Sequence, residues 1–113
     1  MSERYRTYEE FWPFYVSQHL NATCRALHFV GTTVVWIALT LAVVDTPRWL
    51  LAAPLAGYGC AWIGHFFFEK NRPATFTYPL WSLRGDFRMY RLMLLRRMRS
   101  EIARVAALFP AAA

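Results

Sequence analysis

Three histidines and one glutamate are the residues of this chain whose types and spacing point to metal chemistry. His65 and Glu69 stand four positions apart at the end of an apolar run, and a helix places positions i and i+4 on the same face. The other two histidines are His19 and His28. An imidazole or a carboxylate near lipid is costly unless it is paired or bound to a metal. Together, three imidazoles and one carboxylate form a ligand set that suits iron, zinc or manganese.

Two apolar runs must position these side chains. Residues 27–44 and 49–68 each have about the length needed to cross a bilayer core, roughly 20 residues. Residues 45–48 between them form a short polar turn, so the sequence predicts an antiparallel transmembrane hairpin; the alternative is a buried hairpin of a soluble protein. His28 and His65 are equally far from the centre of the turn, about 28 Å at 1.5 Å per residue. We therefore expect these two side chains to meet.

His19 needs a break in the chain to join the other two histidines. It precedes His28 by nine positions, so on one continuous helix the two side chains would face opposite ways. Asn21 lies between them and is a typical helix N-cap, which would let the N-terminal segment fold back. The alternative for each histidine is a structural role, in which its ring caps a helix or bonds to a carbonyl group.

The remaining segments are expected to flank the hairpin. Residues 8–20 are aromatic and amphipathic, which predicts a helix at the membrane interface. Residues 73–83 contain two prolines and are expected to be irregular. Residues 86–109 are expected to form one cationic helix, in which Arg97 pairs with Glu101. The apolar stripe of that helix comprises Phe87, Tyr90, Leu94, Met98, Ile102, Val105 and Phe109.

The composition indicates a membrane protein. Hydrophobic residues make up 57% of the 113 residues and charged residues only 18%, and a small soluble fold has too little interior to bury so many apolar side chains. The expected fold is all-α. It is an integral membrane helical bundle of one domain, residues 1–113, with a central transmembrane hairpin flanked by an N-terminal amphipathic helix and a C-terminal cationic amphipathic helix.

The basic residues are concentrated in the last third of the chain. From Glu69 onward nine Lys and Arg stand against three acidic residues, which accounts for the whole net charge of +6. Because they are interleaved with Leu, Met and Phe, they favour anionic membrane lipid as the partner, and no nucleic acid is expected. The positive-inside rule then places both termini in the cytoplasm. Cys24 and Cys60 have no metal-binding spacing and are expected to be small buried apolar residues.

Three stretches of the chain resemble a known family. They are FYVSQHLNATCRALH, LHFVGTT and YGCAWIGHFFFEKNRPATFTYPLWSLRGDFRMY. They are similar to the Mpo1-like family over about residues 8–95, most of the chain. The family's characterised fungal member is a membrane-embedded, Fe(II)-dependent dioxygenase that shortens 2-hydroxy fatty acids by one carbon. The resemblance therefore implies an oxidoreductase of fatty acid alpha-oxidation, with O₂ and a 2-hydroxy fatty acid as its substrates.

The resemblance also implies roles for individual residues. His19, His28 and His65 fall at the family's histidine positions and are the implied Fe(II) ligands. Glu69 is the fourth candidate catalytic residue, either as a direct iron ligand or as a group that orients one of the histidines. The substrate carboxylate would be held by three basic residues near this set, whose alternative role is contact with lipid headgroups: Lys70, Arg72 and Arg84. This Ala- and Arg-rich chain resembles a bacterial member, which implies the bacterial inner membrane; homo-oligomerisation is left open.

Two other functions remain open from the sequence. One is a b-type haem protein of the membrane, with His28 and His65 as axial ligands from facing helices. The other is a non-catalytic membrane adaptor whose basic helix binds anionic lipid. Bound haem would identify the first, and folding without any metal would favour the second.

Overall fold

The structure, a computed structural model, describes residues 5–108, which are helical and contain no strand. The expected all-α class is therefore confirmed for this part of the chain. The helices fall into two compact units. We call residues 21–73 the hairpin unit, and residues 5–20 together with 74–108 the aromatic unit.

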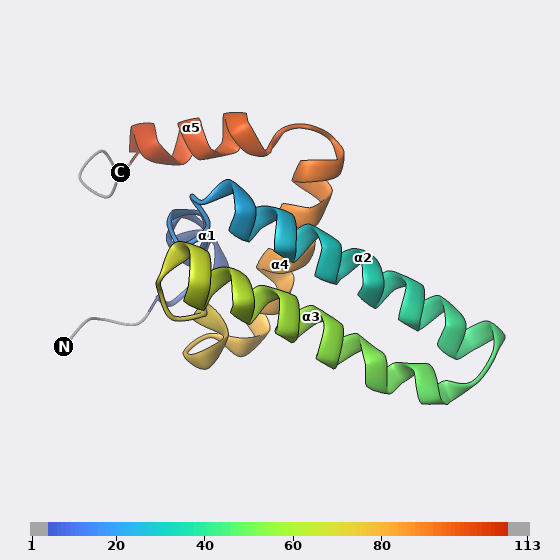
Figure 1. Ribbon diagram of the computed structural model, residues 1–113. Helices are drawn as coiled ribbons and strands as arrows, with labels where there is room; N and C mark the ends of the chain where they lie inside the picture. Colours follow the sequence, from blue (N-terminus) through green and yellow to red (C-terminus); the bar gives the residue numbers. More distant parts are fainter. Residues whose placement is uncertain (1–4, 109–113) are drawn as a thin grey trace. The chain divides into compact units, whose positions relative to one another are not determined.

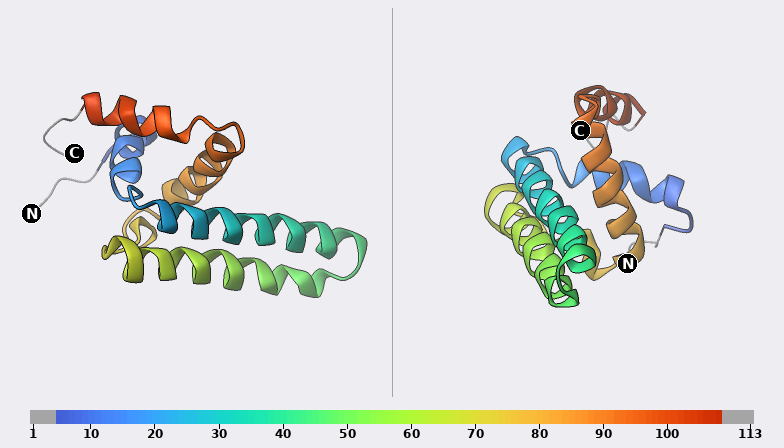
Figure 2. Two further views of the ribbon diagram at one scale, coloured as in Figure 1. Left: turned by 45° about the horizontal axis from the view of Figure 1, so that its top comes forward. Right: turned by 90° about the vertical axis from the view of Figure 1, so that its right-hand side faces the viewer.

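The hairpin unit consists of two long helical segments that lie side by side and antiparallel (Figures 1 and 2). The first is α2 (Ala22–Val44), and the second runs without interruption through three elements: η1 (Pro47–Leu51), a 3-10 helix; α3 (Ala52–Ile63); and η2 (Gly64–Glu69), a π-helix. Asn21 is the N-cap of α2, as expected, since its Oδ1 accepts the Cys24 N–H at 3.0 Å. The expected hairpin is thus present, with its turn at Asp45 and Thr46.

Small residues let the two arms of the hairpin approach closely. A Cβ atom placed on Gly31 would lie 2.9 Å from the Cβ of Cys60, and one on Gly64 would lie 3.0 Å from the Sγ of Cys24. Neither position can accept a side chain unless the neighbouring arm moves. Gly59 is different, because a Cβ there would meet nothing within 4 Å. Close packing of this kind is typical of helices whose interface relies on small residues.

Both arms are apolar and mostly exposed within the structure. Ala22–Val44 and Pro47–Glu69, 23 residues each, are long and apolar enough to cross a membrane. Only 22% and 17% of their most apolar windows are buried, whereas the core helix of a soluble protein is mostly buried. Val43, Leu55 and Phe67 are among the side chains left exposed. Exposed apolar side chains in such number are typical of a surface that contacts a membrane or another protein.

The aromatic unit consists of α1 (Tyr8–Ser17), η3 (Ala74–Phe76, a 3-10 helix), α4 (Pro79–Leu94) and α5 (Met98–Leu108). Residues 73–83, expected to be irregular, instead contain η3 and the first turn of α4. Pro79 is the first residue of α4, where its missing N–H has no partner to lose. Helix α1, expected to lie at a membrane interface, supplies half of the buried core residues of this unit. Its buried side chains are Tyr8, Phe11, Trp12, Tyr15 and Val16.

The segment from 86 to 109 was expected to be one helix, and this expectation is wrong: it is divided between α4 and α5. The chain turns at Arg96, which has the left-handed φ of 58°, and the Arg97 N–H bonds to the Leu92 carbonyl at 2.7 Å. A left-handed residue followed by such a bond is a common helix ending. After this turn, Met98 and Val105 of α5 are buried in the aromatic core. Phe109 of the predicted stripe lies outside the described residues.

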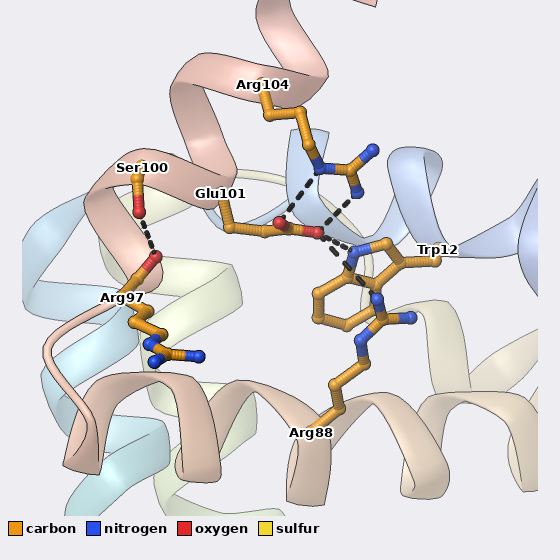
Figure 3. Close-up of polar contacts among 6 residues, drawn as sticks. All are labelled: Trp12, Arg88, Arg97, Ser100, Glu101 and Arg104. Atoms are coloured by element: carbon orange, nitrogen blue, oxygen red, sulfur yellow. Dashed lines mark hydrogen bonds and ion pairs between the residues drawn. The ribbon is translucent and has the colours of Figure 1, made fainter.

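Glu101 joins α5 to both other long helices of the aromatic unit (Figure 3). It accepts the indole N–H of Trp12 at 2.6 Å and pairs with Arg104 at 2.6 Å and Arg88 at 3.9 Å. The expected partner Arg97 is therefore replaced by Arg104 and Arg88. These contacts, with the Arg104 hydrogen bond first among them, lower the pKa of Glu101 to about 2.

Candidate metal centre

His28 is held on α2 by a bond from its own ring. It is buried, and its Nδ1 lies 2.9 Å from the carbonyl oxygen of Cys24, one turn earlier on the helix. A carbonyl oxygen can only accept a hydrogen bond, so Nδ1 must carry the proton. In the neutral ring Nε2 then holds the lone pair. Neutral imidazole with a donating Nδ1–H is the form in which histidine binds metals through Nε2.

His65 is in the same state, but a side chain holds it. Its Nδ1 lies 2.7 Å from Oδ1 of Asn71, so Nδ1 again carries the proton. Asn71 reaches back to the ring because the chain reverses at Lys70, which has the left-handed φ of 60°. The His65 carbonyl accepts the N–H groups of both Lys70 and Asn71 at the end of η2. Sequence reasoning treated Asn71 only as part of a helix stop and missed this role.

The rings of His28 and His65 lie side by side, as expected from their equal distances along the chain from the turn of the hairpin. The centroids of His28 and His65 are 4.9 Å apart, and the ring planes are perpendicular. Gly64, the residue before His65, packs on Cys24, whose carbonyl holds His28. This close approach of the two arms is what allows the rings to meet. Cys24 itself is buried, as expected, and its Sγ lies 3.7 Å from Nδ1 of His28.

His19 belongs to the aromatic unit and follows the end of α1. It is only 1% exposed, and its Nδ1 lies 2.6 Å from the carbonyl oxygen of Tyr15. The imidazole also stacks on the Tyr15 ring, with 4.0 Å between centroids. Nδ1 is therefore a donor here too, and Nε2 holds the lone pair. Leu20 alone separates His19 from Asn21, the N-cap of α2.

All three histidines thus share one protonation pattern. Each Nδ1–H donates to an oxygen of the protein, which fixes the tautomer and presents Nε2 as the electron-pair donor. Metal-binding histidines show this arrangement almost invariably, because the bond orients the ring and raises the basicity of the other nitrogen. With one nitrogen from each residue, the three are a donor set that can hold a metal ion. Neutral imidazoles suit iron, zinc, copper and nickel.

Glu69 has a different neighbour from the one its spacing suggested. Its Oε1 accepts the backbone N–H of Asn21, at the start of α2. The partner of the His65 Nδ1–H is Asn71, not this carboxylate. The expected shared face assumed an α-helix, whereas η2 is a π-helix with a wider turn. A carboxylate at a helix N-terminus also interacts favourably with the helix dipole.

The three basic residues proposed to hold a substrate carboxylate lie in different surroundings. Lys70 and Arg72 are exposed and flank Asn71 in the hairpin unit. Arg84 is in the aromatic unit, where its guanidinium stacks over the Tyr8 ring at 3.9 Å from the centroid. Lys70 and Arg72 therefore lie beside the His65 partner, and Arg84 makes a cation–π contact; the substrate role expected for all three stays a prediction.

Asp86 is a half-buried acid that the sequence did not single out as a site residue. It accepts the hydroxyl of Tyr15 at 2.5 Å. Burial raises the pKa of Asp86 to about 7, and the hydrogen bond from Tyr15 opposes that shift. Because Tyr15 also bonds to and stacks on His19, this carboxyl group is connected to a candidate ligand through one side chain.

Comparison with known proteins identifies a family. The family described as 2-hydroxy-palmitic acid dioxygenase Mpo1-like matches residues 5–98, a range that includes all three histidines and Asn71. No curated protein and no solved structure matches the chain. The family description names a dioxygenase of a 2-hydroxy fatty acid, and the match covers most of the 113 residues. The chain therefore belongs to the Mpo1-like family of 2-hydroxy-palmitic acid dioxygenases.

Proposed function

We propose that this protein is a non-haem, Fe(II)-dependent dioxygenase that shortens 2-hydroxy fatty acids by one carbon at the membrane. The observation that carries the proposal is the common state of His19, His28 and His65. Each is buried, and each donates its Nδ1–H to a protein oxygen, so that three Nε2 lone pairs are prepared for a metal. A bond to a carbonyl group would serve a structural histidine equally well. Ligation is favoured because the rings of His28 and His65 lie only 4.9 Å apart and the three histidines are a group that could hold a metal ion.

Iron is the metal that joins this donor set to the family's chemistry. Zinc accepts imidazole equally well but carries no redox chemistry, whereas a dioxygenase must activate O₂. Bound iron would supply that activation, and a site with few protein ligands keeps positions open for substrate and O₂. His28 and His65 would bind it from the two arms of the hairpin. His19 would complete the set from the residues just before α2.

The residues of the chain would then hold the metal ligands in place and orient the substrate. Asn71 and two backbone carbonyl groups keep the imidazoles in one tautomer. Glu69 fixes the start of α2 through the Asn21 N–H, two residues after His19. Lys70 and Arg72, exposed on either side of Asn71, are the residues we assign to the substrate carboxylate.

The membrane is the second part of the proposal. We infer that Ala22–Val44 and Pro47–Glu69 cross the bilayer, because their apolar side chains are mostly exposed in the structure. The basic last third of the chain then places both termini in the cytoplasm by the positive-inside rule. In this orientation His65 and Asn71 would lie at the cytoplasmic end of the hairpin. The carboxylate of a membrane-bound fatty acid would lie at the same level, at the membrane surface. The alkyl tail of the substrate would remain in lipid.

One observation favours this proposal over a haem protein with His28 and His65 as axial ligands. Axial imidazoles stand on opposite faces of the porphyrin, each about 2 Å from the iron as in other metal–imidazole bonds. Their ring centres lie beyond the ligand nitrogens, so they must be farther apart than the 4.9 Å found here. The closely spaced rings are better suited to a single small metal ion that both residues would hold.

The reaction itself tests the proposed function. Protein in detergent, loaded anaerobically with Fe(II), is mixed with 2-hydroxypalmitate and air-saturated buffer. We expect O₂ consumption and a product one carbon shorter by mass spectrometry, with no Soret absorption from the protein. A Soret band with haem-dependent activity, or the absence of both product and substrate-dependent O₂ uptake, would contradict the proposal.

A further inference from the structure

The Gly85-Asp86 pair of α4 has no role in the proposed reaction, yet both residues contact a single aromatic side chain. That side chain is Tyr15, which is 1% exposed and lies one helical turn before His19. Tyr15 touches His19 in two ways. Its carbonyl oxygen accepts the imidazole Nδ1–H at 2.6 Å, and its ring stacks on the imidazole at 4.0 Å with 24° between planes.

Asp86 fixes the far end of the Tyr15 side chain. The phenol hydroxyl donates to Oδ1 of Asp86 at 2.5 Å, across 71 positions of sequence. A hydrogen bond to a carboxylate is among the stronger ones in proteins, and it leaves the phenol ring no freedom to slide along α4. The position of the ring under His19 is therefore set from another helix.

Gly85 allows the Tyr15 ring to lie close against the backbone of α4. A Cβ atom on Gly85 would lie 2.9 Å from Cδ2 and 3.0 Å from Cε2 of Tyr15, closer than real Cβ contacts. The ring has little room to retreat, because His19 stacks on it and Trp12 lies parallel to it with 5.4 Å between centroids. Any side chain at Gly85 must therefore displace Tyr15, and with it the support of His19.

We propose that Gly85 and Asp86 are positioning residues for the metal centre, acting through Tyr15 on the orientation and tautomer of His19. The inference rests on the proposed function in one respect, that His19 is a metal ligand. It assigns a reason to this glycine–aspartate pair: the glycine admits the tyrosine ring and the aspartate anchors its hydroxyl. Stacking and a carbonyl bond then hold the imidazole with Nε2 as the donor atom.

The decisive variant is Tyr15→Phe, which keeps the ring and removes only the hydroxyl that Asp86 holds. Full-length protein with ¹⁵N-labelled histidine is studied in micelles without metal, and the signals of the three histidines are assigned by single substitutions. We expect the His19 ring nitrogens to shift towards a mixture of tautomers while those of His28 and His65 stay unchanged. Tyr58→Phe, at an exposed tyrosine of α3, is the matched control and should change none of them.

Metal affinity is the second measurement on the same variants. Fe(II) titrated anaerobically against a competing chelator should bind about 10–100-fold more weakly to Tyr15→Phe and to Gly85→Ala, the loss typical of groups that support a ligand. Asp86→Asn keeps an oxygen for the tyrosine hydroxyl and should restore most of the affinity that Asp86→Leu loses. Gly59→Ala, where a Cβ meets nothing within 4 Å, should bind like the wild type.

The outcomes separate this inference from the proposed function. Unchanged His19 signals and unchanged Fe(II) affinity in Tyr15→Phe would overturn the positioning role, even if Gly85→Ala fails to fold. A wild-type protein that binds no Fe(II) would overturn the proposed function, while the His19 signals still report whether Tyr15 and Asp86 set the tautomer. Equal losses in Asp86→Asn and Asp86→Leu would show that charge, and not the hydroxyl anchor, is what matters, which contradicts the mechanism argued here.

Discussion

At the scale of single residues, the proposed metal centre depends as much on the groups that hold each imidazole as on the imidazoles themselves. His19 and His28 each use a backbone carbonyl one turn away, which any sequence provides. His65 uses the side chain of Asn71, and this partner can be changed by mutation without touching a ligand.

Asn71 gives the first prediction. Asn71→Ala removes the acceptor that fixes the His65 tautomer, so Fe(II) affinity should fall about 10–100-fold. Asn71→Asp keeps an oxygen at the same position and should bind Fe(II) within a few-fold of wild type. Chelator competition measures both variants. Equal affinities of Asn71→Ala and wild type would show that Asn71 does not support His65.

Glu69 gives the second prediction, because its carboxylate bonds to the Asn21 N–H at the start of α2. Glu69→Gln keeps an acceptor oxygen, but a bond to a neutral group is worth roughly 1 kcal/mol against about 2 kcal/mol for a charged one. We therefore expect nearly full iron content with a several-fold loss of turnover. Metal analysis and steady-state kinetics of Glu69→Gln test this prediction. Loss of all iron in this variant would make Glu69 a direct ligand and contradict the role assigned here.

The residue scale also shows what sequence reasoning can and cannot reach. Counting from the turn was enough to pair His28 with His65, because both arms rise steadily from the same point. The contact between His65 and Asn71 depends on a π-helical turn and on a left-handed Lys70. A left-handed φ is uncommon for a residue other than glycine, so the local sequence did not predict this conformation at Lys70.

At the scale of elements, the approach of the two hairpin arms depends on Gly64, which precedes His65 and packs on Cys24. Gly64→Ala should push the arms apart, since its Cβ would lie 3.0 Å from Sγ and 3.2 Å from Cα of Cys24. We expect a lower Tm and at least tenfold weaker Fe(II) binding. Gly59→Ala is the matched control on the same segment and should change neither. An unchanged Fe(II) affinity in Gly64→Ala would show that His28 and His65 do not depend on this approach.

The link between α5 and the rest of the aromatic unit predicts a pH dependence. Hydrogen bonding to Arg104 and Trp12 lowers the pKa of Glu101 from 4.5 to about 2 in the folded state. A folded-state pKa below the unfolded value contributes stability above pH 4.5, and that contribution is lost as the pH falls from 4.5 towards 2. Denaturation followed by near-ultraviolet circular dichroism should show wild type more stable than Glu101→Gln at pH 6, with the difference closing in this range. A difference that stays constant from pH 6 to pH 2 would contradict the assignment.

The elements were predicted to different degrees, for physical reasons. The apolar runs and the Asn21 cap identified α2 and its start, because these signals are local. The division between α4 and α5 was not predicted, because the stripe from Phe87 to Val105 continues across it with helical spacing. Contacts between residues far apart in the sequence accompany the turn at Arg96. Trp12 of α1 bonds to Glu101 of α5, and Met98 at the start of α5 is buried in the core.

At the scale of the whole molecule, the two units differ in the environment they suit. The hairpin unit exposes apolar side chains along both arms, whereas the aromatic unit has a core of buried rings and carries most of the arginines. The composition, the two apolar runs and the distribution of charge along the chain predicted an all-α protein with an apolar hairpin and a basic end. The interfacial position expected for α1 remains a prediction; what the structure adds is that its aromatic side chains form part of a protein core, which an aromatic amphipathic helix suits as well as a membrane surface.

The central claim is that His19, His28 and His65 bind one iron ion, and the most direct test is iron content per chain after anaerobic loading. Wild type should retain about one non-haem Fe(II) per chain after desalting, as expected for a single three-histidine site. His19→Ala, His28→Ala and His65→Ala should each lose it and lose turnover of 2-hydroxypalmitate, while still inserting into membranes. A wild-type protein with less than about a tenth of an equivalent of iron, or a histidine variant with wild-type iron content and turnover, would contradict the account.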